Sequence, residues 1–430
     1  MVWKRVEGLQ KESLIMYEIQ PQLFQLSNGI RVVYLHAPAQ VAHLGVTVLA
    51  GSRFEKQGED GLAHFLEHSI FKGTNKRKAF HILSRLDSVG GELNAYTAKE
   101  EICVYASFTK EHIARASELL ADIILNSNFP VKEINKEKEI ILDEINSYLD
   151  SPSDKIFDDF EAYLFEGHTL GNNILGTKER VQNFNRDHLM DYVKRFFTSD
   201  NMVISFVGDL SKGKLEKILE EDFKSCPQGN HVPVIEKFEP RKTFRIRSKE
   251  ANYQVHAIVG GLAPSYKEEA RRGMTLLTNI LGGPALNSRL TLSIREKYGY
   301  SYNVEANYTP YVDTGFWSVY LGTDPKYIDK SLSLIRKELK LLRTKKLGVL
   351  QLNRAKEQLK GHLALGMDSN SGLMLGLGKS LLLFNQIDTI QEIYQGIDKL
   401  TESELMEIAN TYFSDDNYSE LIFDLSENTN

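Results

Sequence analysis

Apolar positions along the chain follow an extended spacing in some segments and a helical spacing in others. The turn dipeptide Asn28-Gly29 precedes the first extended run. The extended runs predict strands at 29–35, 42–50, 102–108 and 202–209. The helical spacing predicts helices near 58–72 and over 110–126 and 131–150. Strands grouped with helix pairs in this way predict α+β domains, each a mostly antiparallel sheet covered by helices.

A weak internal duplication indicates two such domains. Three segments recur in the same order about 215 to 218 residues later. The pairs are 110–120 with 325–335, 134–151 with 352–369, and 195–201 with 411–417. We therefore expect two homologous domains of typical size.

The join between the two domains is expected where the composition changes. Residues 223–244 contain three prolines, one glycine and many charges, a composition typical of a linker. This predicts an N-terminal catalytic domain over 1–222, a linker over 223–244, and a C-terminal domain over 245–430.

Composition excludes several classes of protein. The chain has 430 residues, of which 42% are hydrophobic and 26% charged, as in soluble globular proteins. A net charge of -6 and the lack of a basic block argue against nucleic-acid binding. Two cysteines exclude a disulfide framework and a cysteine-rich metal site. The chain has no apolar stretch of membrane-spanning length and no signal-like segment in 1–22, so we expect a cytoplasmic protein without a membrane segment.

The segment 61–71 contains the candidate chemistry, because it reads His64-Phe65-Leu66-Glu67-His68. On a helix, His64 and His68 are four residues apart and project from one face, so both imidazoles can bind one divalent metal. Glu67 lies close enough to reach a water molecule at that metal. The alternative interpretation is a surface helix with scattered polar residues, or histidines that are satisfied within a core.

A hydrolytic zinc site needs a third protein ligand and an open position. The predicted helix at 131–150 offers Glu137 and Glu144, which are two turns apart on one stripe. One carboxylate can bind the metal while the other orients a histidine. The alternative is a solvated acidic face, but apolar residues share this stripe, and a carboxylate among them needs a partner.

The chain resembles the pitrilysin/insulinase family (M16), which includes the mitochondrial processing peptidases. The H-x-x-E-H text is its inverted zincin motif, and the segment 90–108 is similar to the strand that follows its metal helix. The resemblance implies that His64, His68 and Glu144 bind zinc, that Glu67 activates water, and that Glu137 is the second essential glutamate. It also implies the LuxS/MPP-like metallohydrolase fold, in the short two-domain form.

The resemblance also suggests residues for substrate binding and transition-state stabilisation. Arg295 and Tyr302 match positions that help to bind substrate and the developing oxyanion, although ordinary helix-end chemistry is an alternative. Asn94 and Ala95 fall in an edge strand that pairs with an extended peptide, with a plain hairpin as the alternative.

Two acidic residues bear on cleavage preference. Asp154 and Asp158 resemble the residues of the processing peptidases that receive a substrate arginine, and a spacing of four places both on one helical face. A solvated acidic stretch remains the alternative.

The second half lacks the metal-binding residues, since His362 and Ala355 stand at the counterparts of Glu144 and Glu137. We therefore expect one Zn²⁺ per chain, and a metalloendopeptidase that hydrolyses unfolded peptides inside a chamber closed by two chains. A homodimer is expected, and a heterodimer is possible. The alternatives are a partner-dependent or non-catalytic subunit of a heterodimeric processing peptidase, and a peptide-binding module with structural zinc.

Overall fold

The computed structural model describes residues 20–229, 233–240, 242–250 and 253–425. Residues 1–19 lie outside the described residues. The expectation that the segment 1–22 contains no signal sequence falls mostly on them. Within the described ranges, no helix is both long and apolar enough to cross a bilayer.

Two compact units make up the chain, and neither is one continuous stretch of sequence. The first unit combines 1–142, 174–235 and 365–393. The second unit combines 143–173, 236–364 and 394–430. Between Phe223 and Arg245, the described residues form no helix or strand. The division of the sequence at 223–244 stays a prediction. It separates the two duplicated halves of the sequence, whereas each compact unit contains segments from both halves.

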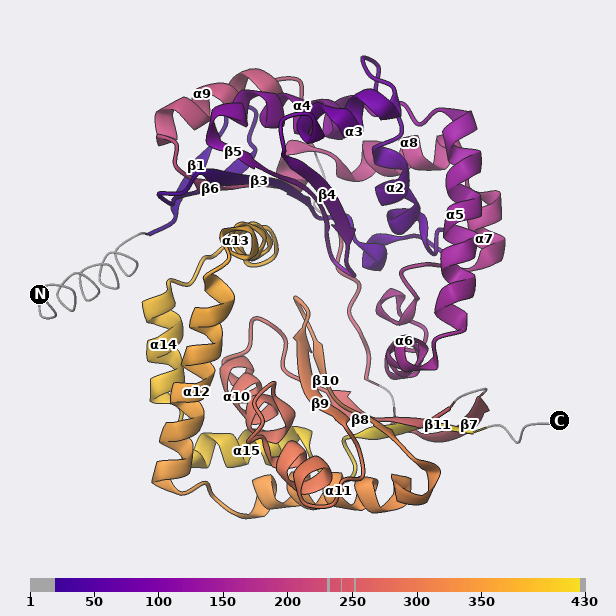
Figure 1. The fold of residues 1–430 in the computed structure, drawn as a ribbon, viewed down its shortest axis with the longest axis vertical. Coiled ribbons are helices and arrows are strands. Elements are labelled where there is room, and N and C mark those ends of the chain that lie inside the picture. Colours follow the sequence, from indigo (N-terminus) through magenta and orange to yellow (C-terminus); the bar gives the residue numbers. More distant parts are fainter. Residues whose placement is uncertain (1–19, 230–232, 241, 251–252, 426–430) are drawn as a thin grey trace, which may run out of the picture. The chain divides into compact units, whose positions relative to one another are not determined.

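The first unit is built on a six-stranded sheet (Figure 1). Its strands are β1 (Gln22–Gln25), β2 (Arg31–His36), β3 (Val41–Val48), β4 (Glu92–Thr97), β5 (Ile102–Thr109) and β6 (Met202–Gly208). They lie in the order β1-β2-β6-β3-β5-β4, and every neighbouring pair is antiparallel except β2 and β6. Strand β4 therefore forms one edge of the sheet.

Helices cover both faces of this sheet. On one face lie α3 (Ala79–Asp87), α4 (Ile113–Asn126) and α9 (Lys212–Phe223), and on the other lies α13 (Asn370–Phe384), which contacts β3 and β6 (Figure 1). Helices α2 (Leu62–Ile70), α7 (Lys178–Asn183) and α8 (Arg186–Phe196) also belong to this unit. Helix α5 (Val131–Leu149) begins in this unit and ends in the segment 143–173 of the second.

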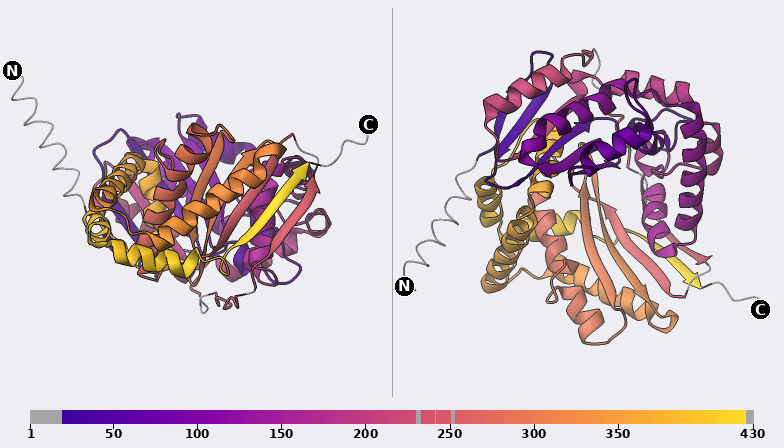
Figure 2. Two further views of the ribbon diagram at one scale, coloured as in Figure 1. Left: turned by 90° about the horizontal axis from the view of Figure 1, so that it is seen from below. Right: turned by 45° about the horizontal axis from the view of Figure 1, so that its top comes forward.

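The second unit is built on a five-stranded sheet. Its strands are β7 (Arg245–Glu250), β8 (Val255–Leu262), β9 (Asn303–Pro310), β10 (Gly315–Thr323) and β11 (Ser419–Leu425). They lie in the order β7-β11-β8-β10-β9, and only β7 and β11 are parallel. Four helices lie wholly in this unit: α6 (Pro152–Leu164), α10 (Ala270–Gly282), α11 (Ile328–Thr344) and α15 (Glu402–Tyr412). Most of α12 (Val349–Met367) and of α14 (Ile390–Lys399) also belongs to it. In the left view of Figure 2, the orange helix α11 lies over one face of this sheet.

The two sheets share one topology, which agrees with the duplication in the sequence. Across the sheet, the order β2-β6-β3-β5-β4 of the first unit corresponds to the order β7-β11-β8-β10-β9 of the second. The repeated segments also coincide with equivalent helices, α4 with α11 and α5 with α12. The prediction of two α+β domains is confirmed, and each sheet is mixed because it contains one parallel pair.

One helix from each half belongs to the unit built by the other half. Helix α6 follows α5 in the first half of the chain, but it packs on β8 and β11 of the second unit. Helix α13 follows α12 in the second half, but it packs on β3 and β6 of the first. Since β8 and β11 correspond to β3 and β6, the exchange is equivalent in both directions.

The start of α2 is held by a buried side chain. Gly61 has a φ of 94°, which favours glycine, and a Cβ there would lie 2.7 Å from the Leu175 carbonyl oxygen. The Glu55 carboxyl group accepts hydrogen bonds from the Gly61 N–H at 3.2 Å and the Ala63 N–H at 2.8 Å. Glu55 is only 4% exposed, and its burial raises its pKa to about 8. It thus satisfies two amide groups that the first turn of a helix leaves without partners.

We expect Glu55→Ala to lower the free energy of unfolding by about 2 kcal/mol, because two buried N–H groups lose their acceptor. Glu55→Gln keeps one acceptor oxygen and should lose less than half as much. Urea denaturation measures both values, with the exposed Glu221→Ala as the control. Equal stabilities for the wild type and Glu55→Ala would show that Glu55 does not cap α2.

Candidate metal centre

Helix α2 places two histidines beside each other and buries its apolar side chains. The ring centroids of His64 and His68 lie 4.6 Å apart in an edge-on arrangement. Leu62, Phe65 and Leu66 are fully buried, which fixes the rotation of the helix about its axis. His64 itself is only 8% exposed. The burial of the apolar side therefore determines where the two imidazoles point.

Helix α5 brings a carboxylate to the two imidazoles. Ligand atoms of His64, His68 and Glu144 all lie within 4.8 Å of one another. In Figure 1, α2 lies between β4 and α5. Two imidazole nitrogens and one carboxylate oxygen are a ligand set that catalytic zinc sites use, with a further position open to solvent. The donor set therefore fits a zinc ion.

Glu137 lies two turns before Glu144 on α5 and is 3% exposed. Its Oε2 lies 3.5 Å from His68 Nδ1, and its Oε1 lies 2.8 Å from Lys72 Nζ. Burial acts to raise the pKa of Glu137, but hydrogen bonds from His68 and Lys72 outweigh this, so the pKa is lowered. A carboxylate beside Nδ1 leaves Nε2 of His68 for a metal.

His64 is kept in the form that binds metals. Burial, and to a smaller extent the neighbouring His68, lower the pKa of His64 to about 4. At neutral pH the imidazole is therefore uncharged, and one of its ring nitrogens has a lone pair that can bind a metal.

Glu67 is held by a residue that the motif does not reveal. The Thr97 hydroxyl donates a hydrogen bond of 2.6 Å to Glu67 Oε2. Thr97 is the last residue of β4, thirty positions along the chain from Glu67, and α2 contacts β4. Sequence reasoning missed Thr97, because a lone threonine at the end of a strand has no distinguishing signal.

The predicted peptide-binding residues lie in β4, at the edge of the first sheet. Asn94 pairs with Tyr105 of β5, and Ala95 pairs with Val104. In the described residues, the opposite side of β4 pairs with no strand. An exposed edge of this kind can receive an extended peptide.

The two acidic residues of the predicted arginine site both lie on α6. Asp154 is exposed and accepts a hydrogen bond of 2.6 Å from Ser151 Oγ near the start of that helix. Asp158 is partly buried and accepts hydrogen bonds from the Tyr148 hydroxyl at 2.7 Å and from Asn173 Nδ2 at 3.3 Å. Tyr148 and Asn173 therefore hold the Asp158 carboxylate in place, and its role with a substrate stays a prediction.

Arg295 and Tyr302 lie in the second unit. Arg295 is in a π-helical turn at Thr291–Glu296, with its Nε 3.4 Å from Glu296 Oε1. Tyr302 directly precedes β9 and is 89% exposed, so its hydroxyl is accessible. Their contact with a substrate stays a prediction.

Two family profiles match most of the chain. The profile of the insulinase family of peptidases, family M16, matches residues 31–178, which contain the three candidate ligands. The profile of the inactive domain of the M16 peptidases matches residues 183–359.

Relatives match over nearly their whole length. The uncharacterized zinc protease YmxG of Bacillus subtilis is 32% identical over 394 residues, which cover 91% of this chain and 96% of the relative. The uncharacterized zinc protease ML0855 of Mycobacterium leprae is 33% identical, over 90% of this chain and 87% of the relative. A protease from Helicobacter pylori has a similar fold, with a TM-score of 0.88 at 21% identity, over 94% of this chain and 99% of the other.

The lowered pKa of His64 predicts a pH dependence of stability. The unfolded imidazole takes up a proton near pH 6.5 but the folded one only near pH 4, so stability falls as the pH drops below 6.5. We expect a loss of about 3 kcal/mol by pH 4 from this group. Urea denaturation in a chelator at several pH values measures it. The His64→Asn variant should show a shallower dependence, and identical slopes for both proteins would contradict the assignment.

Proposed function

The chain belongs to the insulinase family of peptidases, M16, and on that basis we propose that it hydrolyses peptides with a zinc ion held by His64, His68 and Glu144. The convergence of these three side chains within 4.8 Å supports the proposal most directly. The names of the zinc protease relatives support the choice of metal. We expect one ion per chain.

Zinc bound at this position would polarise the scissile carbonyl and make a water molecule more acidic. Glu67 is the general base of the proposed reaction: its carboxylate takes a proton from the attacking water and passes it to the leaving amine. The hydrogen bond from Thr97 restricts the Glu67 side chain to one orientation, so the proton acceptor does not have to be ordered in each reaction cycle. Glu137 orients His68, while Lys72 compensates the buried charge of Glu137.

The substrate class follows from the free edge of β4. A peptide that adds to this edge forms main-chain hydrogen bonds, which demand an extended conformation but little sequence. Asn94 and Ala95 lie where such a peptide would pair, and the Asn94 amide would bind a substrate carbonyl. Unfolded peptides are therefore the proposed substrates.

Four further residues complete the proposed site. Arg295 and Tyr302 would donate hydrogen bonds to the oxyanion that forms on the scissile carbonyl. Asp154 and Asp158 would receive a basic side chain near the cleaved bond. Asp158 suits this role because its carboxylate is already held by Tyr148 and can accept a further hydrogen bond.

The proposed assembly is a homodimer that closes a chamber around the substrate, in the cytoplasm. A partner-dependent subunit of a heterodimer is the alternative. Size-exclusion chromatography of the purified chain, combined with a peptide cleavage assay, separates the two, because only a homodimer would be active without another protein.

Glu67→Gln should keep its zinc but lower the rate of cleavage by about 10³-fold, since it removes the base and leaves the ligands unchanged. Glu144→Gln should lose both zinc and activity. Metal content by mass spectrometry and cleavage of an unstructured peptide measure these effects, with the exposed Glu139→Gln of α5 as the matched control.

Removal of the metal gives an independent check. A chelator should abolish cleavage, and added Zn²⁺ should restore it. Full activity of a metal-free preparation, or of Glu67→Gln, would exclude the proposed mechanism.

Thr97→Val should lower kcat by about 10-fold to 100-fold with little change in KM or zinc content, because the change removes only the hydrogen bond to the Glu67 carboxylate. Thr97→Ser keeps the hydroxyl and should stay within about threefold of the wild type. Steady-state kinetics measure both variants. Equal losses in valine and serine variants would point to packing instead of the hydrogen bond.

A further inference from the structure

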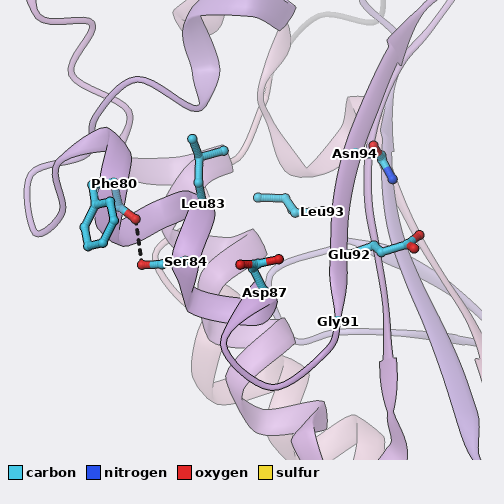
Figure 3. A pocket seen from close by; sticks show the side chains of 8 residues that line it. All are labelled: Phe80, Leu83, Ser84, Asp87, Gly91, Glu92, Leu93 and Asn94. Carbon is cyan, nitrogen blue, oxygen red and sulfur yellow. Dashed lines mark hydrogen bonds between the residues drawn. The ribbon is translucent and has the colours of Figure 1, made fainter.

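A groove of about 470 Å³ lies between helix α3 and the edge strand β4 (Figure 3). Its lining residues are Phe80, Leu83, Ser84, Asp87, Gly91, Glu92, Leu93 and Asn94. All of them belong to the first unit. None of them is a lysine, arginine or histidine, so the groove contains no cationic side chain.

The walls of the groove are apolar and exposed. Phe80 is 73% exposed and Leu83 is 54% exposed, although both are large hydrophobic residues on one side of α3. In Figure 3, Leu83 and Leu93 approach the space between α3 and β4 from its two sides. Exposed hydrophobic side chains that line a hollow are typical of a binding site.

Asp87 is the charged side chain in the space between α3 and β4. In Figure 3 its carboxylate lies there, whereas Glu92 and Asn94 point to the opposite face of β4. The Ser84 hydroxyl donates to the Phe80 carbonyl oxygen at 2.6 Å, so its proton is already used within α3. Among the described residues, no basic side chain forms an ion pair with Asp87, which is the last residue of α3. A negative charge at this end of a helix is unfavourable, so Asp87 does not serve the helix itself.

The position of the groove connects it with the peptide that would pair with β4. Residues 93, 95 and 97 lie on one face of the strand, because successive side chains alternate. Thr97 on this face contacts Glu67, and Leu93 lines the groove. Leu93 precedes Thr97 by four residues, and a strand rises about 3.3 Å per residue. The groove at Leu93 therefore lies about 13 Å from Thr97 along β4.

We propose that this groove binds the side chain of a lysine or arginine in the substrate, about four residues from the cleaved bond. The alkyl stem of such a residue packs against Leu83 and Leu93, and its cationic head reaches the Asp87 carboxylate. A purely apolar side chain would leave Asp87 without a cation, and an acidic one would be repelled by it. This inference rests on the proposed function, because it assumes a peptide along the β4 edge.

The test uses the zinc-loaded Glu67→Gln protein, so that peptides bind without being cleaved. A fluorescent unstructured peptide is varied at each position in turn with lysine, uncharged norleucine or glutamate, and Kd is measured by anisotropy. At one position about four residues from the cleaved bond, lysine should bind about fivefold tighter than norleucine. Glutamate should bind more weakly than either.

Three variants in the same background identify the groove. Asp87→Asn should remove the advantage of lysine over norleucine, and Asp87→Lys should reverse the preference toward glutamate. Leu83→Ala should weaken lysine and norleucine peptides equally, because both contact it through the alkyl stem. Glu92→Gln is the matched control, since its side chain points to the other face of β4 and the lysine preference should persist.

Cleavage by the wild type separates this inference from the proposed function. If the lysine preference depends on Asp87 but no peptide is cleaved, the groove is correct and the peptidase proposal fails. If peptides are cleaved but no position prefers lysine, or Asp87→Asn leaves that preference unchanged, the groove assignment is overturned.

Discussion

The buried carboxylate of Glu137 joins the two helices that carry the candidate metal ligands. It lies 3.5 Å from His68 Nδ1 on α2 and 2.8 Å from Lys72 Nζ, while its own helix α5 carries Glu144 two turns later. A buried carboxylate without such partners would be costly, so α2 and α5 are energetically favoured in the arrangement that satisfies it. This contact therefore holds together the two helices that supply the three candidate ligands.

The exchange of helices gives the duplicated fold a second constraint. Each sheet has the same strand order, and each is covered on one side by a helix from the other half of the chain, α13 on the first sheet and α6 on the second. Close packing favours glycine at position 378 of α13, since a Cβ there would lie 2.9 Å from Ser205 Oγ and Thr47 Oγ1. Each sheet therefore includes residues of a helix from the other half of the chain in its core, Phe160 in the second unit and Met374 in the first.

Strand β4 links the parts of the first unit that bear on function. One end holds Thr97 against Glu67, the middle offers the free edge at Asn94, and the other end lines the groove at Leu93. Because a strand is stiff and its side chains alternate, these three features keep a constant spacing. A peptide along this edge would therefore meet the proposed base and the groove at set positions along its own sequence.

Local features of the chain were predictable from the sequence alone. The spacing of four between His64 and His68 requires one helical face, the spacing of seven relates Glu137 to Glu144, and repeated segments revealed the duplicated topology. These follow from helical geometry and similarity, which act over short stretches of chain.

Only the tertiary structure decided which distant residues meet. The contacts of Thr97 with Glu67 and of Glu55 with the start of α2, the exchange of α6 and α13, and the groove at Asp87 depend on how elements pack. Threonine, aspartate and glutamate are common on any surface, so their types and spacing alone carry no signal of these contacts. Packing is decided by the burial of whole faces, and a single sequence does not reveal which faces meet.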